Sequence, residues 1–122
     1  LPRRSCLSIP GSSEKMLGKG PSLGADMVFL DLEDSVSPLE KVAARAKVVN
    51  AIKSQDWGET VLCVRVNAWD TSWTYGDIIE VVTSANSQPN PGWLAFVRTG
   101  KARASIRHSL KTKHYSVRIF LV

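Results

Sequence analysis

Apolar residues in the first 85 positions form short runs that are separated by longer segments with helical spacing. Three of these runs predict strands, and they are Cys6–Ile9, Met27–Leu32 and Val61–Asn67. The second run is apolar at nearly every position, which is typical of a parallel strand covered by helices and not of an antiparallel strand with one wet face. Residues that favour turns or helix starts follow each run, so we expect strands and helices to alternate.

Helix-start signals follow the first and third predicted strands. After the first, Pro10-Gly11 ends the strand, and Ser12 or Ser13 can cap a helix that extends to about Gly18. After the third, a loop leads to a predicted helix around Tyr75–Ser84. Both helices are expected to pack on the sheet.

The most regular helical pattern in the chain extends from about Pro38 to Lys53. Ser37 suits the N-cap position, and Glu40 three residues later would complete a capping box. Apolar residues that recur at helical spacing are expected to face the core: Leu39, Val42, Ala43, Ala46, Val49 and Ile52.

This order of elements predicts a parallel α/β fold. Periodicity alone does not separate an open doubly wound sheet from a (β/α)₈ barrel. No G-x-G-x-x-G motif follows the first strand, which weakens the dinucleotide-binding version.

Charge divides the chain into two parts, which we take as a predicted domain over residues 1–85 and a tail over residues 86–122. The first part contains nine Lys and Arg and all eleven Asp and Glu, whereas the tail contains seven Lys and Arg and no acid. Within the tail, Trp93–Val97 and Tyr115–Val122 are apolar enough to form strands. No nucleic-acid-binding motif accompanies the basic residues, so we expect them to be solvated and to bind no nucleic acid.

The remaining composition is that of an ordinary globular protein, with 43% apolar residues. We expect no membrane span, because no apolar run reaches about 18 residues. Cys6 and Cys63 lie in apolar runs and are interpreted as buried and unpaired, whereas His108 and His114 are interpreted as solvent-facing. The cytoplasm, or the matrix of an organelle such as the mitochondrion, is the expected location.

Three carboxylates stand close together where the second strand ends. Asp31 and Glu33 share one face of the strand, and Asp34 begins the loop. Such a group is stable only when a cation or hydrogen-bond donors offset its repulsion. A site for a hard cation is one interpretation. Helix-capping and loop acids are the other.

The third strand ends with Arg65 and Asn67, which period-2 alternation places on one face. A buried guanidinium needs a carboxylate partner. That partner is either a substrate carboxylate or a neighbouring acid, Glu33 or Asp34. Both readings stay open, and Asn67 is a second candidate for substrate contact.

Free backbone N–H groups at the first strand–helix junction, Pro10–Ser13, are suited to a phosphate. Lys15 or Lys19 would add positive charge there.

Three segments together resemble the HpcH/HpaI aldolase/citrate lyase β-subunit family, and particularly its malyl-CoA lyase branch. They are RRSCLSIPGSSEKMLGKG, GADMVFLDLEDSVSPLEKVAARAKVVNAI and DWGETVLCVRVNAWDTSWTYGDII, and they keep the family order without a gap from about Arg3 to Ile79. The resemblance implies the N-terminal portion of a (β/α)₈ barrel that uses Mg²⁺. It implies cleavage of a carbon–carbon bond in a CoA thioester, with a small 2-oxo acid as the other partner.

The resemblance also implies roles for individual residues. Arg65 would bind the carboxylate of the small acid, and Lys19 and Arg4 would lie along the CoA phosphates. Glu33 and Asp34 would line the site near the metal without ligating it. Family members are commonly trimers or hexamers, so a homo-oligomer is expected.

The sequence departs from the family after about residue 86. The Glu and Asp that ligate the family's metal follow a fourth strand, and no acid follows Glu80 here. We therefore expect no metal ligand within these residues and interpret residues 86–122 as a truncation, intron or frameshift product. A genuine lineage-specific C-terminus is the alternative. The alternative to an active lyase is a truncated, non-catalytic remnant of such an enzyme.

Overall fold

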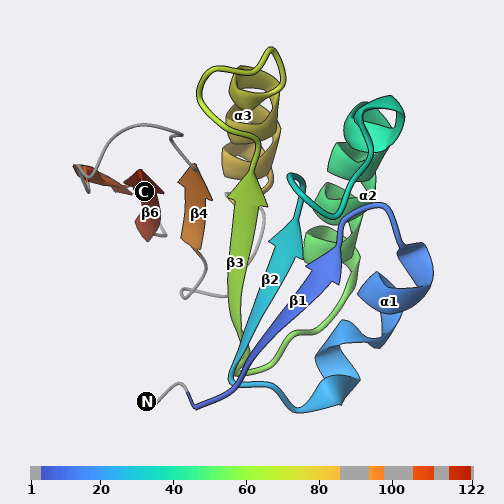
Figure 1. The fold of residues 1–122 in the computed structure, drawn as a ribbon. Helices are drawn as coiled ribbons and strands as arrows, with labels where there is room; N and C mark the ends of the chain where they lie inside the picture. Colours follow the sequence, from blue (N-terminus) through green and yellow to red (C-terminus); the bar gives the residue numbers. More distant parts are fainter. Residues whose placement is uncertain (1–3, 86–93, 98–105, 112–115, 122) are drawn as a thin grey trace.

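A computed structural model describes residues 4–85, 94–97, 106–111 and 116–121 of the chain. The first three strand–helix units follow one another along the chain (Figure 1). Their elements are β1 (Cys6–Pro10), α1 (Glu14–Lys19), η1 (Gly20–Leu23), β2 (Met27–Asp31), η2 (Pro38–Glu40), α2 (Lys41–Ser54), β3 (Val61–Val66) and α3 (Thr74–Ala85). The later strands are β4 (Leu94–Val97), β5 (Ile106–Lys111) and β6 (Ser116–Leu121).

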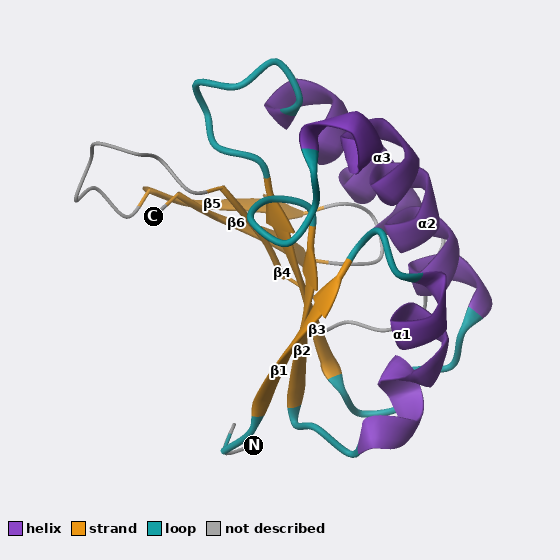
Figure 2. Ribbon diagram, turned by 45° about the vertical axis from the view of Figure 1, so that its right-hand side comes forward, coloured by secondary structure: helices purple, strands orange, loops and turns teal. Residues whose placement is uncertain are grey.

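The strands form one sheet in the order β1-β2-β3-β4-β6-β5. Neighbours from β1 to β4 are parallel, as are β4 and β6, whereas β5 is antiparallel to β6. The parallel α/β prediction is therefore confirmed. Figure 2 shows that α1, α2 and α3 all cover the same face of the sheet.

This arrangement distinguishes between an open doubly wound sheet and a (β/α)₈ barrel, the two architectures that sequence periodicity could not tell apart. A doubly wound fold reverses its strand order and places helices on both faces. Here β1, β2, β3 and β4 follow one another in chain order with helices on one face only. That is the winding of a (β/α)₈ barrel, of which residues 4–85 form the first three units. Beyond β4 the order changes, because β6 lies next to β4 and β5 is antiparallel to β6 at the edge of the sheet.

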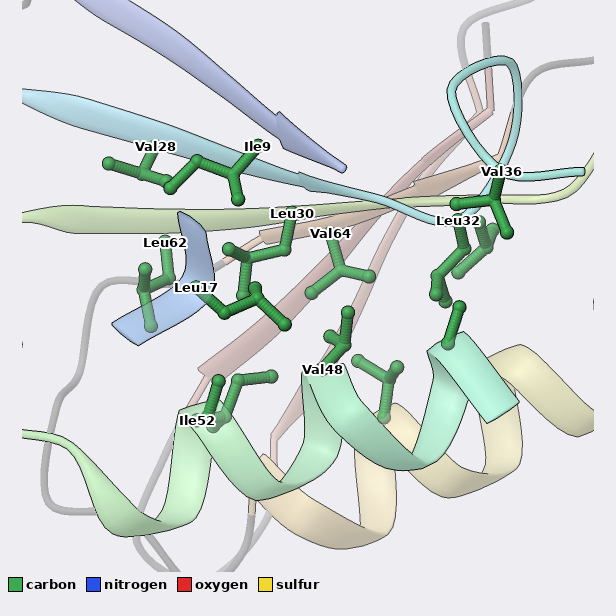
Figure 3. Packing of buried hydrophobic residues seen from close by; sticks show 14 of the residues in the cluster. Ile9, Leu17, Val28, Leu30, Leu32, Val36, Val48, Ile52, Leu62 and Val64 are labelled. Carbon is green, nitrogen blue, oxygen red and sulfur yellow. The ribbon is translucent and has the colours of Figure 1, made fainter. Parts of the chain in front are cut away.

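The core lies between the sheet and the helix layer (Figure 3). Alternate residues of β2 and β3 point into it, and α2 supplies residues one or two turns apart. The members from these three elements and the residue after β2 are Val28, Leu30, Leu32, Ala44, Val48, Ala51, Ile52, Leu62, Val64 and Val66. The intervening residues of the strands, which include Asp31 and Arg65, belong to the face without helices.

The first strand–helix junction is tight because Gly11 lies directly on the end of β2. Its N–H donates to the carbonyl oxygen of Asp31 at 2.7 Å. A Cβ at this position would stand 2.6 Å from that oxygen and 2.8 Å from Val48 Cγ2. Ser13 then caps α1 through its Oγ, which accepts from the Met16 N–H, so the predicted cap is confirmed.

The face of α2 that packs on the sheet differs from the prediction. Leu39 and Val42 are 98% and 64% exposed, while Ala44 and Val48 are fully buried. Alanines and valines occur on all sides of this helix, so several of its faces are about equally apolar in sequence. The aliphatic stem of Lys41 belongs to the face that is buried. Only Ile52 of the predicted set belongs to the core.

The predicted capping box is also wrong in detail. Ser37 Oγ donates to the Glu40 carboxylate at 3.2 Å instead of accepting from the helix backbone. The helix opens with the 3₁₀ turn η2 before α2 begins at Lys41. Helix α3 confirms the prediction of a helix around Tyr75–Ser84.

Both cysteines are free, but only Cys63 is buried, and the prediction of a buried Cys6 is wrong. Cys6 is the first residue of β1, at the edge of the sheet. No helix in the described ranges is long and apolar enough to cross a membrane.

The two predicted tail strands are present as β4 and β6. The prediction for His114 falls outside the described residues, and His108 is placed only as a backbone position in β5.

Candidate functional site

Arg65 and Asp31 form a two-point ion pair near the carboxyl ends of β2 and β3. They are register partners in adjacent parallel strands. Arg65 Nε donates to Asp31 Oδ1 at 2.8 Å, and Nη2 donates to Oδ2 at 2.7 Å. The Asp31 side chain is 1% exposed and that of Arg65 is 26% exposed. The pair is thus a fixed element of the sheet, with the guanidinium partly open to solvent.

The loop after β2 wraps around the Asp31 carboxylate. The N–H groups of Glu33 and Ser35 and the Ser35 hydroxyl donate to its oxygens at 2.9, 3.1 and 2.6 Å. Burial by itself would raise the pKa of Asp31, but the hydrogen bonds from Arg65, Ser35 and the backbone hold this pKa at about 2. The hydrogen bond to Asp31 raises the pKa of Arg65 in turn. Both groups are therefore charged at neutral pH.

Two further carboxylates approach the same guanidinium. Glu33 Oε2 lies 3.6 Å from Arg65 Nε, and Asp34 Oδ2 lies 3.3 Å from Nη1. The Glu33 side chain is 12% exposed, whereas that of Asp34 is 60% exposed. The arginine is thus the donor group that offsets the three acids. Within the described ranges, no three His, Cys, Asp or Glu side chains are grouped so that they could hold a metal ion.

A second polar network lies between the sheet and the helices. Lys41 Nζ donates to the carbonyl oxygens of Leu32 and Glu33 at 3.1 and 2.8 Å, and to Asn67 Oδ1 at 2.6 Å. The ammonium also lies 5.3 Å from the centre of the Trp73 ring. Lys41 is therefore a buried charge, 7% exposed, that ties the segment after β2 to the residue after β3.

Asp77 of α3 completes this network. Its Oδ2 accepts from the Asn67 N–H and Nδ2, at 2.9 and 2.6 Å, and its Oδ1 accepts from Arg45 Nε at 2.9 Å. Arg45 also donates to the Trp73 carbonyl and to Glu80. Asn67 thus contacts residues of α2 and α3 on the helix side, and the expectation that it shares a face with Arg65 is wrong. The chain has left the strand by this residue.

The two basic residues predicted to contact CoA phosphates lie apart from the Arg65 cluster. Arg4 precedes β1, where the strands begin, and its backbone N–H donates to Asp26 Oδ2 at 2.9 Å. Lys19 is the exposed last residue of α1. The structure therefore brings together Arg65, Glu33 and Asp34, whereas Arg4 and Lys19 lie elsewhere and the Asn67 side chain bonds Lys41 and Asp77 on the helix side.

Asp31 is the partner of Arg65 that sequence reasoning missed. Spacing alone pointed to Glu33 and Asp34, but strand register decides which acid lies beside the arginine. The buried Lys41 and Asp77 were missed as well. Spacing gave no signal for them, because a lysine and an arginine four residues apart are typical of a solvated helix face.

Sequential parallel strands, helices on one face and polar side chains at the strand ends define the opening portion of an α/β-barrel protein. The chain belongs to the HpcH/HpaI aldolase/citrate lyase family, whose model matches residues 4–88.

Two curated relatives come from Cereibacter sphaeroides. An L-malyl-CoA/beta-methylmalyl-CoA lyase is 40% identical over 87 residues, which are 71% of this chain and 27% of the relative. A (3S)-malyl-CoA thioesterase is 44% identical over 77 residues, 63% of this chain and 27% of the relative. The chain thus spans about a quarter of the length of each of these relatives.

The protein CitE from Mycobacterium tuberculosis gives a structural match. Its crystal structure in complex with magnesium, acetoacetate and coenzyme A aligns with a TM-score of 0.54 at 26% identity. The alignment covers 80% of this chain and 42% of CitE.

Proposed function

We propose that this chain provides the first βα units of a carbon–carbon lyase that acts on the CoA thioester of a 2-hydroxy acid. Malyl-CoA, methylmalyl-CoA, citramalyl-CoA and citryl-CoA are the substrates of this class. One observation carries the proposal: a partly exposed arginine, oriented by a buried aspartate, stands at the carboxyl end of a parallel strand. Sites of barrel enzymes lie at this end, and two relatives carry malyl-CoA in their names.

In this proposal Arg65 binds the carboxylate at the acid end of the substrate. A guanidinium offers up to five N–H donors in one plane, and the pair with Asp31 uses two of them. Glu33 and Asp34 lie beside the bound acid and set the charge around it. Asn67 acts from the helix side as support for the end of β3.

The proposed cleavage breaks the bond between the hydroxyl-bearing carbon and the carbon next to the thioester carbonyl. The hydroxyl-bearing carbon becomes the carbonyl of a 2-oxo acid and loses its hydroxyl proton. The other carbon keeps the bonding electron pair and takes up a proton, which yields an acyl-CoA. Arg65 holds the carboxylate of the departing 2-oxo acid and keeps the breaking bond in place.

Magnesium and CoA enter the proposal through CitE, which was solved with both. The described residues do not fit a magnesium site, because the acids near Arg65 direct their oxygens to the guanidinium and to backbone N–H groups. We therefore assign no step to a metal here. No Asp or Glu of this sequence lies outside the described residues, so carboxylate ligands for a metal would come from a segment that this sequence does not contain. Lys19 and Arg4 remain the candidates for the CoA phosphates.

Product analysis tests the proposal and separates it from the thioesterase chemistry of the second relative. The purified protein would be incubated with malyl-CoA, with and without magnesium. Equal amounts of a 2-oxo acid and acetyl-CoA are expected for a lyase, whereas free CoA thiol and malate indicate hydrolysis. Arg65→Met should lower kcat/KM by at least about 100-fold, as expected for a lost charged hydrogen-bond pair. An absence of products would favour the non-catalytic remnant.

A further inference from the structure

The guanidinium of Arg65 has two edges with different partners. Nε and Nη2 point to Asp31 at 2.8 and 2.7 Å and form the inner edge. At the outer end, Nη1 lies 3.3 Å from Asp34 Oδ2. A carboxylate ligand that approaches from solvent therefore meets the end of the arginine where Asp34 stands.

Asp31 and Asp34 differ in how easily a ligand could displace them from Arg65. Asp31 is 1% exposed, and its oxygens also accept from Glu33 N–H and from both donors of Ser35. Loss of its partner would leave a buried charge uncompensated, which is strongly unfavourable. Asp34 is 60% exposed, and an ion pair of that kind contributes little to stability. Exchange with a ligand is thus favoured at Asp34 over Asp31.

We propose that Asp34 occupies the ligand-binding end of Arg65 in the free protein and is displaced by the substrate carboxylate. This inference rests on the proposed function and specifies how its site recognises a small 2-oxo acid. Asp31 stays in place and orients the guanidinium, so it is a positioning residue. Asp34 acts as an internal competitor whose charge lowers the affinity for anions.

Competition of this kind predicts a gain of affinity when the competitor is removed. Asp34→Asn takes away one negative charge while it keeps the size of the side chain. The affinity for a small carboxylate should rise by about fivefold, the factor that corresponds to a weak exposed ion pair. Asp31→Asn should lower the same affinity, because the arginine loses the group that orients it. A change of opposite sign at two aspartates is not the result of general destabilisation.

The experiment is a titration with pyruvate, followed through the Arg65 Nε–H resonance in ¹⁵N-labelled full-length chain. Asp34→Asn and Asp34→Ser should both bind more tightly than the wild type, and Asp70→Asn, an exposed acid after β3, should bind equally. Unchanged or weaker binding by both Asp34 variants would overturn the inference, as would a lack of any pyruvate effect on this resonance.

Failure of the inference can be told apart from failure of the lyase proposal. Lyase turnover together with unchanged affinity in both Asp34 variants would refute the competitor role alone. Tighter pyruvate binding by these variants, with no carbon–carbon cleavage in any preparation, would support the competitor role and refute the lyase reaction.

Discussion

The ammonium of Lys41 and the side-chain carbonyl of Asn67 meet at 2.6 Å in the layer between the sheet and the helices. Lys41 begins α2 and Asn67 follows β3, so this bond joins a helix start to a strand end. The same ammonium holds the carbonyl oxygens of Leu32 and Glu33. A single buried charge therefore determines the spacing of two loops at the candidate site.

Lys41→Met should destabilise the protein by about 2–4 kcal/mol, because three oxygens would lose the ammonium in a buried setting, and of these only the Glu33 carbonyl has a further donor among the described residues, the Val36 N–H at 3.3 Å. Methionine keeps the aliphatic stem, so the loss reports on the ammonium. Urea unfolding followed by circular dichroism measures the effect. Lys53→Met, at an exposed position of the same helix, is the control and should change stability by less than about 0.5 kcal/mol. Equal effects of the two substitutions would contradict the importance of the buried network.

Asp77→Asn should destabilise the protein by about 3–5 kcal/mol, since it leaves the Arg45 charge without its closest partner. Both Asp77 oxygens accept hydrogen bonds, from Arg45 and from Asn67, so an amide nitrogen in either place would face another donor. Thermal or urea unfolding measures the loss. Asp70→Asn is the matched exposed control. A loss below about 1 kcal/mol for Asp77→Asn would show that the network is not needed for stability.

Acid should destabilise the protein between about pH 4 and pH 2 through Asp31. The pKa of this group is about 2 in the folded chain and 3.8 at its ordinary value. A lowered pKa stabilises the fold above the ordinary value, and this contribution, roughly 2 kcal/mol, is lost as the pH falls through the folded value. Urea midpoints measured at several pH values across this window test the expectation.

Asp31→Asn serves as the comparison for this pH dependence. Its stability should fall less steeply from pH 4 to pH 2 than that of the wild type. Some slope should remain, because hydrogen bonds from the Arg4 and Ser5 backbone lower the pKa of Asp26 as well. Parallel curves for wild type and variant would refute the role of Asp31 in the acid response.

Gly20 and Gly18 form a matched pair for a packing test. A Cβ on Gly20 would stand 2.6 Å from Cη2 of Trp57, whose ring is held by a hydrogen bond from Nε1 to the Ala51 carbonyl. Gly20→Ala should therefore cost about 1–3 kcal/mol. Gly18 lies inside α1 with nothing within 4 Å of its Cβ position, so Gly18→Ala should stabilise by about 0.5–1 kcal/mol. Unfolding midpoints that shift in the same direction would contradict this packing.

Strands β1, β2, β3, β4 and β6 were predictable because their apolar runs are short and bounded by turn residues. Strand β5 was not predicted, because its sequence, IRHSLK, is mostly polar. The buried face of α2 was not predictable. In a helix rich in alanine and valine, tertiary contacts with the strands decide which face is buried. A rule that places only apolar residues in the core cannot predict that a lysine is buried. Leu39, fully exposed, and Lys41, buried, reverse the expected pattern.

The location of the candidate site was predictable, but the carboxylate that pairs with Arg65 was not. The ends of parallel strands drew attention to Arg65, Glu33 and Asp34, and the structure brings these three together. That Asp31 binds the arginine follows from strand register, which depends on tertiary packing. Asn67 departs from strand alternation because the chain turns toward α3, where Asp77 captures its amide.

The strictly sequential order of β1, β2 and β3 also bears on how fast the chain can fold. Cys6 pairs with Met27, and Met27 pairs with Val61, so each pairing joins residues that are more than 20 positions apart. No hairpin turn brings these strands together, and each contact must wait for an intervening helix and its loops to close. Collapse of α2 onto the strands, more than any local turn, should therefore limit the rate at which this sheet forms.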